Sequence, residues 1–293
     1  MEKLLIVADR QHSGKVIARG LDFARQMGLQ PQVLVFTWAS LKGVEAMQAG
    51  SAAPLKKALL ARHVDHAREL IEKHCSDDAN SVLVRGVWSK KPEEWLISHL
   101  QQNAADYYGV VALVEETDSG MLAQRNWDLL RRSPVRVLRV AGEHWKRTHS
   151  VLAAVDLATS SRDKLRLNER ILAEAKDVAG ALGADLNVVS AVVVPQLLED
   201  LDVIDLNSYA DELKRKMQPE LERLCEKYGL KKSQFVLKRG EVDKIIVSVA
   251  ADYKAQLVVM GTVGRRGLAA MVLGNTAEEI LEHLHTDVLA LKP

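Results

Sequence analysis

The chain of 293 residues carries the same order of structural patterns twice, and this repetition limits its fold more than any other feature. An apolar run that ends in aspartate, KLLIVAD at 3–9, starts the first half, and SVLAAVD at 150–156 starts the second. Each half continues through alternating helix and strand patterns to a closing strand, VRVLRV at 135–140 or DVLALK at 287–292. Strands that alternate with helices require right-handed crossovers and a sheet covered on both faces. We therefore expect two doubly wound α/β domains, each with a five-stranded, mostly parallel sheet.

The length of the repeat indicates a duplicated domain, because the units of solenoid proteins are much shorter. We expect domain 1 at residues 1–141 and domain 2 at residues 149–293, joined in the polar stretch GEHWKRTH. The first helix of each half is expected to end at Gly28 or Gly183, where a left-handed terminus is readily accepted. Two domains also agree with the length of the chain and its 47% hydrophobic content.

The overall charge offers little attraction to a polyanion. Lys and Arg number 40 against 39 Asp and Glu, so the formal net charge is +1. This balance predicts neither direct nucleic-acid binding nor a membrane surface as partner. The N-terminal apolar run is too short for a signal peptide and no segment has the apolar length of a membrane span, which predicts a cytoplasmic protein. Cys75 and Cys225 are expected to be reduced thiols.

A glycine-rich stretch in the second half has the most informative spacing. Gly261 ends an apolar strand, Gly264 follows after two residues, and Gly274 follows after nine more, directly before the helical pattern NTAEEIL. Gly261 would allow a sharp turn, Gly264 would let a phosphate approach the backbone, and Gly274 would expose amide groups at a helix start. An alternative is a capping box between Thr276 and Glu279, which would stabilise the helix without a ligand.

The expected position of this glycine-rich stretch in the sheet favours a ligand site. Ligands of open α/β sheets bind outside the carboxyl ends of the strands, where Asp156 also ends its strand. A nucleoside could therefore lie between Asp156 and Gly261. Arg265 and Arg266 would add positive charge at the outer face of such a site.

The spacing Gly-x2-Gly-x9-Gly resembles the nucleotide signature of the universal stress protein family. The two tandem copies and the ending GNTAEEILEHLHTDVLALKP make the chain similar to the tandem, E-type members of that family. The resemblance implies an adenine nucleotide alpha hydrolase-like fold that binds ATP or a related adenine nucleotide, with Mg²⁺ as a candidate companion. Many family sites carry Ser or Thr after the third glycine, where this chain has Asn275. The candidate nucleotide-binding residues are Asp156, Val192, Gly261, Gly264, Arg265, Gly274, Asn275 and Thr276.

The first half lacks the second and third glycines of this signature. The corresponding stretch retains Gly120 and places Glu115, Glu116 and Asp118 where a phosphate would need hydrogen-bond donors. We expect domain 1 to hold a degenerate nucleotide site, with a structural or regulatory role or a ligand other than ATP. His63 and His66 in this half are expected to form a solvent-facing cluster rather than a metal site.

The expected function is that of a non-catalytic stress-response protein whose nucleotide-bound state is read by a partner. No Walker motif and no dinucleotide fingerprint occurs in the sequence. The alternatives are an interaction scaffold without nucleotide, a slow ATPase, and a carrier of an apolar ligand such as a fatty acid along VPQLLEDLDVIDLNSYADEL. The resemblance also implies that the two closing strands pair in an intramolecular pseudo-dimer, and whole chains could form a homodimer.

Overall fold

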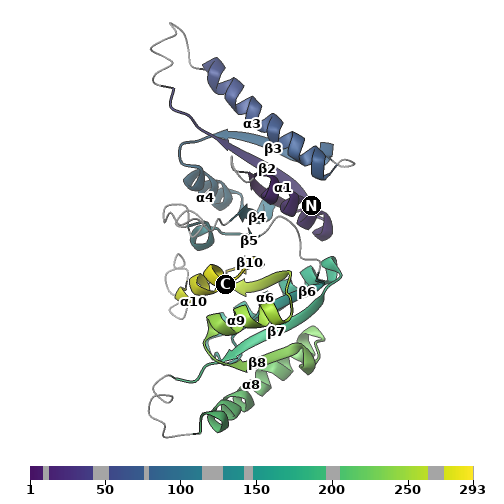
Figure 1. The fold of residues 1–293 in the computed structure, drawn as a ribbon, viewed down its shortest axis with the longest axis vertical. Helices are drawn as coiled ribbons and strands as arrows, with labels where there is room; N and C mark the ends of the chain where they lie inside the picture. The colour runs from purple at the N-terminus through teal and green to yellow at the C-terminus, as the bar shows by residue number, and fades with distance from the viewer. Residues whose placement is uncertain are drawn as a thin grey trace. The chain divides into compact units, whose positions relative to one another are not determined.

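The computed structural model describes residues 1–8, 13–41, 53–75, 79–113, 128–141, 148–195, 205–262 and 274–292. The chain divides into two compact units, Met1–Trp145 and Lys146–Pro293 (Figure 1). The expected join at 142–149 lies outside the described residues except for Thr148 and His149.

Unit 1 contains a parallel sheet in the order β3-β2-β1-β4-β5. The strands are β1 (Lys3–Ala8), β2 (Gln30–Thr37), β3 (Leu83–Trp88), β4 (Tyr107–Leu113) and β5 (Arg136–Val140). Ala8, the last residue of β1, is in register with Val35 of β2, which continues to Thr37 at the carboxyl edge of the sheet.

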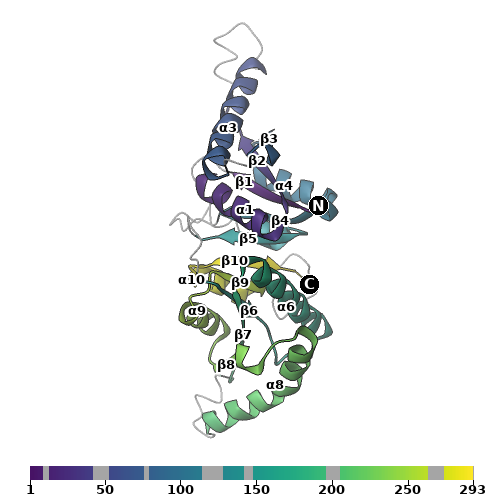
Figure 2. The same cartoon turned by 90° about the vertical axis from the view of Figure 1, so that its right-hand side faces the viewer.

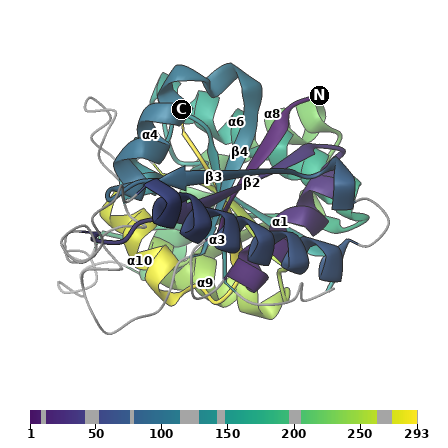
Figure 3. The same ribbon diagram turned by 90° about the horizontal axis from the view of Figure 1, so that it is seen from above.

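Helices cover both faces of this sheet. Helices α1 (Ser13–Met27) and α3 (Ala53–His74) lie on one face, and α4 (Pro92–Gln102) lies on the other (Figures 2 and 3). Coverage on both sides explains why consecutive β1 residues Leu4, Leu5 and Ile6 are all fully buried instead of alternating. Two short 3₁₀ helices, η1 (Ala79–Ser81) and η2 (Ala104–Asp106), precede β3 and β4.

Unit 2 repeats the arrangement, with a parallel sheet in the order β10-β9-β6-β7-β8. Its strands are β6 (Ser150–Ala154), β7 (Asp185–Val192), β8 (Phe235–Arg239), β9 (Leu257–Gly261) and β10 (Asp287–Leu291). The predicted fold class, a duplicated five-stranded parallel α/β domain, is confirmed.

The helices of unit 2 are also divided between the two faces. Helices α6 (Arg162–Leu182) and α8 (Leu206–Tyr228) lie on one side, and α9 (Val242–Asp252) and α10 (Asn275–His283) lie on the other (Figure 2). A third 3₁₀ helix, η3 (Lys232–Gln234), leads into β8. Gly28 after α1 and Gly183 after α6 have φ values of 64° and 59°, which confirms the predicted left-handed helix ends.

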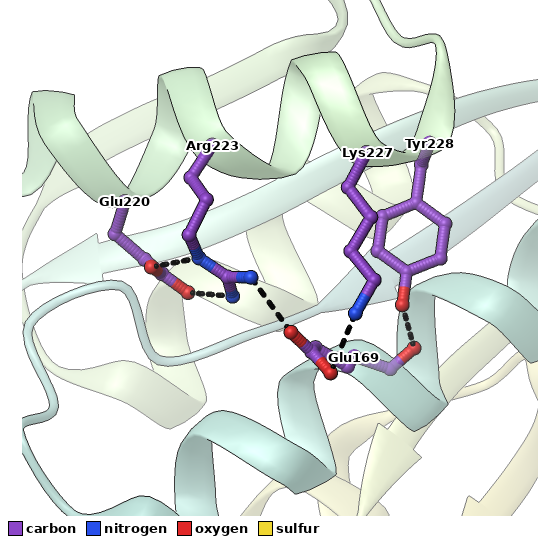
Figure 4. A network of polar contacts seen from close by, with 5 residues as sticks. All are labelled: Glu169, Glu220, Arg223, Lys227 and Tyr228. Carbon is purple, nitrogen blue, oxygen red and sulfur yellow. Dashed lines mark hydrogen bonds and ion pairs between the residues drawn. The ribbon is translucent and has the colours of Figure 1, made fainter.

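A cluster of polar contacts joins α6 to α8 (Figure 4). The Glu169 carboxylate accepts hydrogen bonds from Arg223 at 2.7 Å and from Lys227 at 2.9 Å, and the Tyr228 hydroxyl donates to the Glu169 carbonyl at 3.0 Å. Glu220 holds the other side of the Arg223 guanidinium through two bonds of 2.8 Å. Hydrogen bonds from Lys227 and then Arg223 lower the pKa of Glu169. The carboxylate therefore stays charged and fixes α8 against α6.

The structure also bears on the predictions about the cysteines and about membrane spans. Both cysteines, Cys75 and Cys225, carry free thiols, as expected. Among the helices within the described ranges, none combines the length and the apolar character needed to cross a membrane.

Candidate functional site

The candidate site of unit 2 lies where the direction of strand succession reverses. From β6 the chain adds β7 and β8 on one side of the sheet, and it then returns to add β9 and β10 on the other side. The reversal point is therefore between β6 and β9, whose residues Ala154 and Met260 are in register. Ligands of open α/β sheets bind in the crevice at such a point, outside the carboxyl ends of the strands.

Asp156 lies at this point, two residues after β6, and buried side chains hold its backbone. The Asp156 amide donates to Asn168 Oδ1 at 3.0 Å, and Asn168 Nδ2 donates to the Asp156 carbonyl at 2.8 Å. The next amide, of Leu157, donates to Ser190 Oγ at 3.2 Å. Asn168 and Ser190 are each only 3% exposed. These contacts fix the strand end and leave the Asp156 carboxylate at the surface.

The Asp156 carboxylate has a cationic neighbour. Lys164, in the first turn of α6, places Nζ 3.1 Å from Asp156 Oδ2. The side chains are 28% and 48% exposed, so this ion pair contributes little to stability and can open to admit another group. Lys164 also brings a positive charge to the sheet edge.

Gly261 ends β9 beside Asp156, and packing explains the glycine. A Cβ at this position would lie 2.5 Å from Leu167 Cδ2 and 3.1 Å from Leu167 Cγ. Gly261 lies within the strand, in register with Leu291 of β10, and is not among the glycines with positive φ. The expectation that Gly261 makes a sharp turn is therefore wrong. Its lack of a side chain makes room for α6.

Gly274 returns the chain to the same edge and begins α10. Its amide donates to the carbonyl of Thr262 at 3.1 Å, directly after β9. Gly274 is the N-cap of the helix, and its carbonyl accepts from Ala277 and Glu278 at 2.8 and 3.1 Å. The Gly274 donor is thus used within the chain. The following amides, of Asn275 and Thr276, belong to the first turn, where a helix supplies no internal acceptor.

The cap also decides between the two interpretations of this helix start. A capping box would require Thr276 at the N-cap, but Gly274 occupies that position and Thr276 is the second residue of the helix. The alternative of a Thr276–Glu279 capping box is therefore wrong. Thr276 is exposed, and Glu278 lies in the first turn.

The remaining candidate residues are buried at this edge or lie outside the described part of the chain. Val192, the last residue of β7, is fully buried, and its carbonyl accepts from the Gly240 amide at 3.2 Å. Gly264 and Arg265 lie outside the described residues. The structure thus brings Asp156, Gly261 and Gly274 to one edge, and Val192 ends the neighbouring strand β7 at the same edge with its side chain buried.

Sequence reasoning missed Asn168, Ser190 and Lys164. One signal for Asn168 was present, because it is a polar residue on the apolar face of the α6 pattern, beside the buried Leu167 and Ile171. The interpretation of His63 as solvent-facing is also wrong. His63 is half-buried, and its Nδ1 lies 2.8 Å from Oγ1 of the buried Thr37, while His66 is exposed as expected.

Comparison with known proteins identifies the family. The model of the universal stress protein family matches residues 148–292, which span β6 to β10. The chain belongs to the universal stress protein family. Universal stress protein E of Escherichia coli K12 is 28% identical over 216 residues, which cover 72% of this chain and 68% of the relative. The homologue from Haemophilus influenzae is 26% identical over 211 residues, which cover 71% and 68%.

Solved structures extend the likeness to both units of this tandem universal stress protein. A universal stress protein from Pseudomonas aeruginosa UCBPP-PA14 superposes with a TM-score of 0.70 at 26% identity, covering 100% of this chain and 94% of that one. One from Archaeoglobus fulgidus has a TM-score of 0.59 at 17% identity, covering 99% and 98%, and shows the shared fold alone.

Proposed function

We propose that unit 2 binds ATP or a related adenine nucleotide at the reversal point between β6 and β9, as part of a non-catalytic, cytoplasmic stress-response protein. One observation carries the proposal. An aspartate with an anchored backbone, a glycine strand end and the first turn of a helix converge at this edge, although Asp156 and Gly274 are far apart in sequence.

The Asp156 carboxylate is the proposed partner of the nucleoside end. A carboxylate accepts hydrogen bonds from hydroxyl groups, and the backbone contacts with Asn168 hold this acceptor in place before a ligand arrives. Binding would replace or share the exposed contact with Lys164.

The phosphates are proposed to lie at the start of α10. The Gly274 amide donates to Thr262, so the amides of Asn275 and Thr276 are the donors of this turn that we assign to a phosphate. The exposed Thr276 hydroxyl can add one further bond. Glu278 in the same turn repels polyphosphate, and a bound Mg²⁺ would offset that repulsion by neutralising phosphate charge. Gly264 and Arg265 stay predicted contacts.

The pairing of closing strands stays a proposal that rests on the family resemblance. Within its own unit, β5 and β10 each stand at one end of the strand order, so each sheet taken alone has an open edge there. An intramolecular pseudo-dimer would hide two such edges. Amide cross-peaks between β5 and β10 would support it, and rapid exchange of the β5 and β10 amides in the whole chain would contradict it.

Calorimetric titration of the whole chain with MgATP tests the nucleotide proposal. We expect saturable binding to the wild type, and a loss of at least tenfold in Gly264→Asp and in Asp156→Ala. Glu241→Ala, which removes an exposed carboxylate paired with Lys244, is the matched control and should bind as the wild type does. Absence of binding would favour the scaffold.

Two further measurements test the apolar-carrier and slow-ATPase hypotheses. Mass spectrometry of ligands released from the purified protein would reveal a co-purified lipid if the chain is an apolar carrier. The segment proposed for that role, 194–213, has residues 196–204 outside the described part. Release of phosphate from bound ATP, measured over hours, would favour the slow ATPase.

A further inference from the structure

Unit 1 contains a cavity at the carboxyl edge of its own sheet. Its volume is about 120 Å³. The described residues that line it come from β1, β2, the first residue of α1, and α3: Ala8, Ser13, Val35, Phe36, His63, His66 and Ala67. This is the edge at which open α/β sheets bind ligands.

Small residues leave the space open. Ala8 and Ala67 are each 2% exposed and Ser13 is 8% exposed, so three buried positions around the cavity carry short side chains. A leucine at any of them would occupy part of the space. An apolar cavity of roughly 150 Å³ can hold benzene, so the volume in unit 1 suits a molecule near the size of one ring. A long acyl chain or a nucleoside triphosphate exceeds it.

The polar groups lie on the α1 and α3 side. The Ser13 hydroxyl and the imidazoles of His63 and His66 supply hydrogen-bonding atoms, whereas Ala8, Val35 and Ala67 present apolar surface. His63 is held in one orientation, because Thr37 Oγ1 lies 2.8 Å from its Nδ1 and Thr37 is 1% exposed. A cavity with an apolar floor and a few fixed polar groups is the usual form of a small-molecule site.

The lining also restricts the charge of the ligand. None of the seven described lining residues is Lys, Arg, Asp or Glu. Glu69 Oε2 lies 3.5 Å from the His66 Nδ1, and both of these side chains are more than half exposed. Among these described residues, an ionic ligand would therefore find no fixed counter-charge.

We propose that unit 1 binds a small uncharged molecule, with an apolar body the size of one aromatic ring and a single hydrogen-bonding head group, in the cavity under α3. The apolar body packs on Ala8, Val35 and Ala67. The head group bonds to Ser13 or to the imidazoles. This site is separate from the proposed nucleotide site of unit 2, and neither depends on the other.

Fluorine NMR of the whole chain at pH 8 tests this proposal with 4-fluorophenol as the probe. We expect saturable broadening or shift of the probe signal. Fluorobenzene, which lacks the head group, should bind about 2- to 12-fold more weakly, the range of one hydrogen bond. The anion 4-fluorobenzoate should bind at least tenfold more weakly. Tighter binding of the anion than of the phenol would overturn the proposed ligand class. Saturable binding of adenosine to unit 1 without any binding of the phenol would overturn it too.

A filled variant tests the location. Ala67→Leu should reduce 4-fluorophenol binding at least tenfold, while the matched control Arg68→Ala, on the outer face of the same helix, should bind as the wild type does. Tryptophan fluorescence checks that unit 1 of the filled variant is folded. If the variant is not folded, the wild type is used instead. Nuclear Overhauser contacts from the probe to the labelled methyl groups of Ala8 and Ala67 would then place the probe in the cavity. Contacts to other alanines only, or equal binding to a folded Ala67→Leu variant, would refute the site.

Discussion

Replacing Asn168 with alanine should loosen the strand end that carries Asp156. The substitution removes two hydrogen bonds, one of 3.0 Å from the Asp156 amide and one of 2.8 Å to the Asp156 carbonyl. Each such bond contributes about 0.5–1.5 kcal/mol net, so the local opening free energy should fall by about 1–3 kcal/mol. Asp156 itself is exposed, so water can replace part of the loss, which places the expected value in the lower half of that range.

Hydrogen exchange gives a local readout of this change. A loss of about 1–2 kcal/mol corresponds to about 5- to 30-fold faster exchange of the Asp156 amide. The Leu157 amide, held by Ser190 Oγ, should follow to a smaller extent. Exchange in unit 1 should not change. All five tryptophans lie in Met1–Trp145, so their fluorescence provides an independent check that unit 1 stays folded.

Asn207→Ala is the matched control for this experiment. Asn207 is exposed on α8, and its Oδ1 accepts one bond of 3.2 Å from Arg239, so the same truncation should change stability by less than about 0.5 kcal/mol. Unchanged protection of Asp156 in Asn168→Ala would refute the claim that Asn168 anchors the site. Equal effects of the two substitutions on stability would show that Asn168 contributes no more than an exposed helix residue does.

Three further substitutions probe other contacts. Gly261→Ala should destabilise unit 2 by at most about 1 kcal/mol in urea unfolding followed by circular dichroism, because its Cβ would meet the end of the Leu167 side chain, which must shift. Leu167→Ala added to it should cost less than the two single changes summed, and strict additivity would refute the packing explanation. Glu169→Gln should lower the free energy of unfolding by about 1 kcal/mol at pH 7, because solvent screens the exposed ion pairs with Arg223 and Lys227. Because the pKa of Glu169 is lowered in the folded protein, the wild type has this stabilisation above the ordinary carboxyl pKa and loses it as the pH falls further. An acid dependence of stability that is the same in the variant and the wild type would contradict this explanation. Burial, followed by the charges of Arg85 and Lys3, lowers the pKa of His99, so unit 1 should lose stability as the pH falls below about 6.5. Unfolding followed by tryptophan fluorescence measures this loss, and His99→Gln should make the stability of unit 1 less dependent on pH.

The fold followed from the sequence because its signals were local and repeated. Each β strand was marked by a short apolar run, and Gly28 and Gly183 marked helix ends through their own backbone preference. The convergence of Asp156 and Gly261 also followed, because parallel strands place their carboxyl ends on one edge of the sheet.

The contacts that build the site could not be predicted in the same way. Asn168 reaches Asp156 across 12 residues only because α6 packs back over the end of β6. Gly261 was expected to make a turn, but its requirement comes from Leu167, on another element. His63 was expected in solvent, but it meets Thr37 across 26 residues. In each case tertiary packing decides which partner the residue contacts, and its sequence neighbours do not identify that partner.

The central claim is that the carboxyl edge between β6 and β9 holds an adenine nucleotide by main-chain donors at the start of α10. Amide NMR of the ¹⁵N-labelled whole chain during titration with MgATP tests it most directly. We predict that the Asn275 and Thr276 resonances shift in a saturable manner together with those around Asp156, whereas the Gly274 amide, bonded to Thr262, moves less. Saturation of the protein with ATP while the Asn275, Thr276 and Asp156 resonances stay in place would contradict the claim.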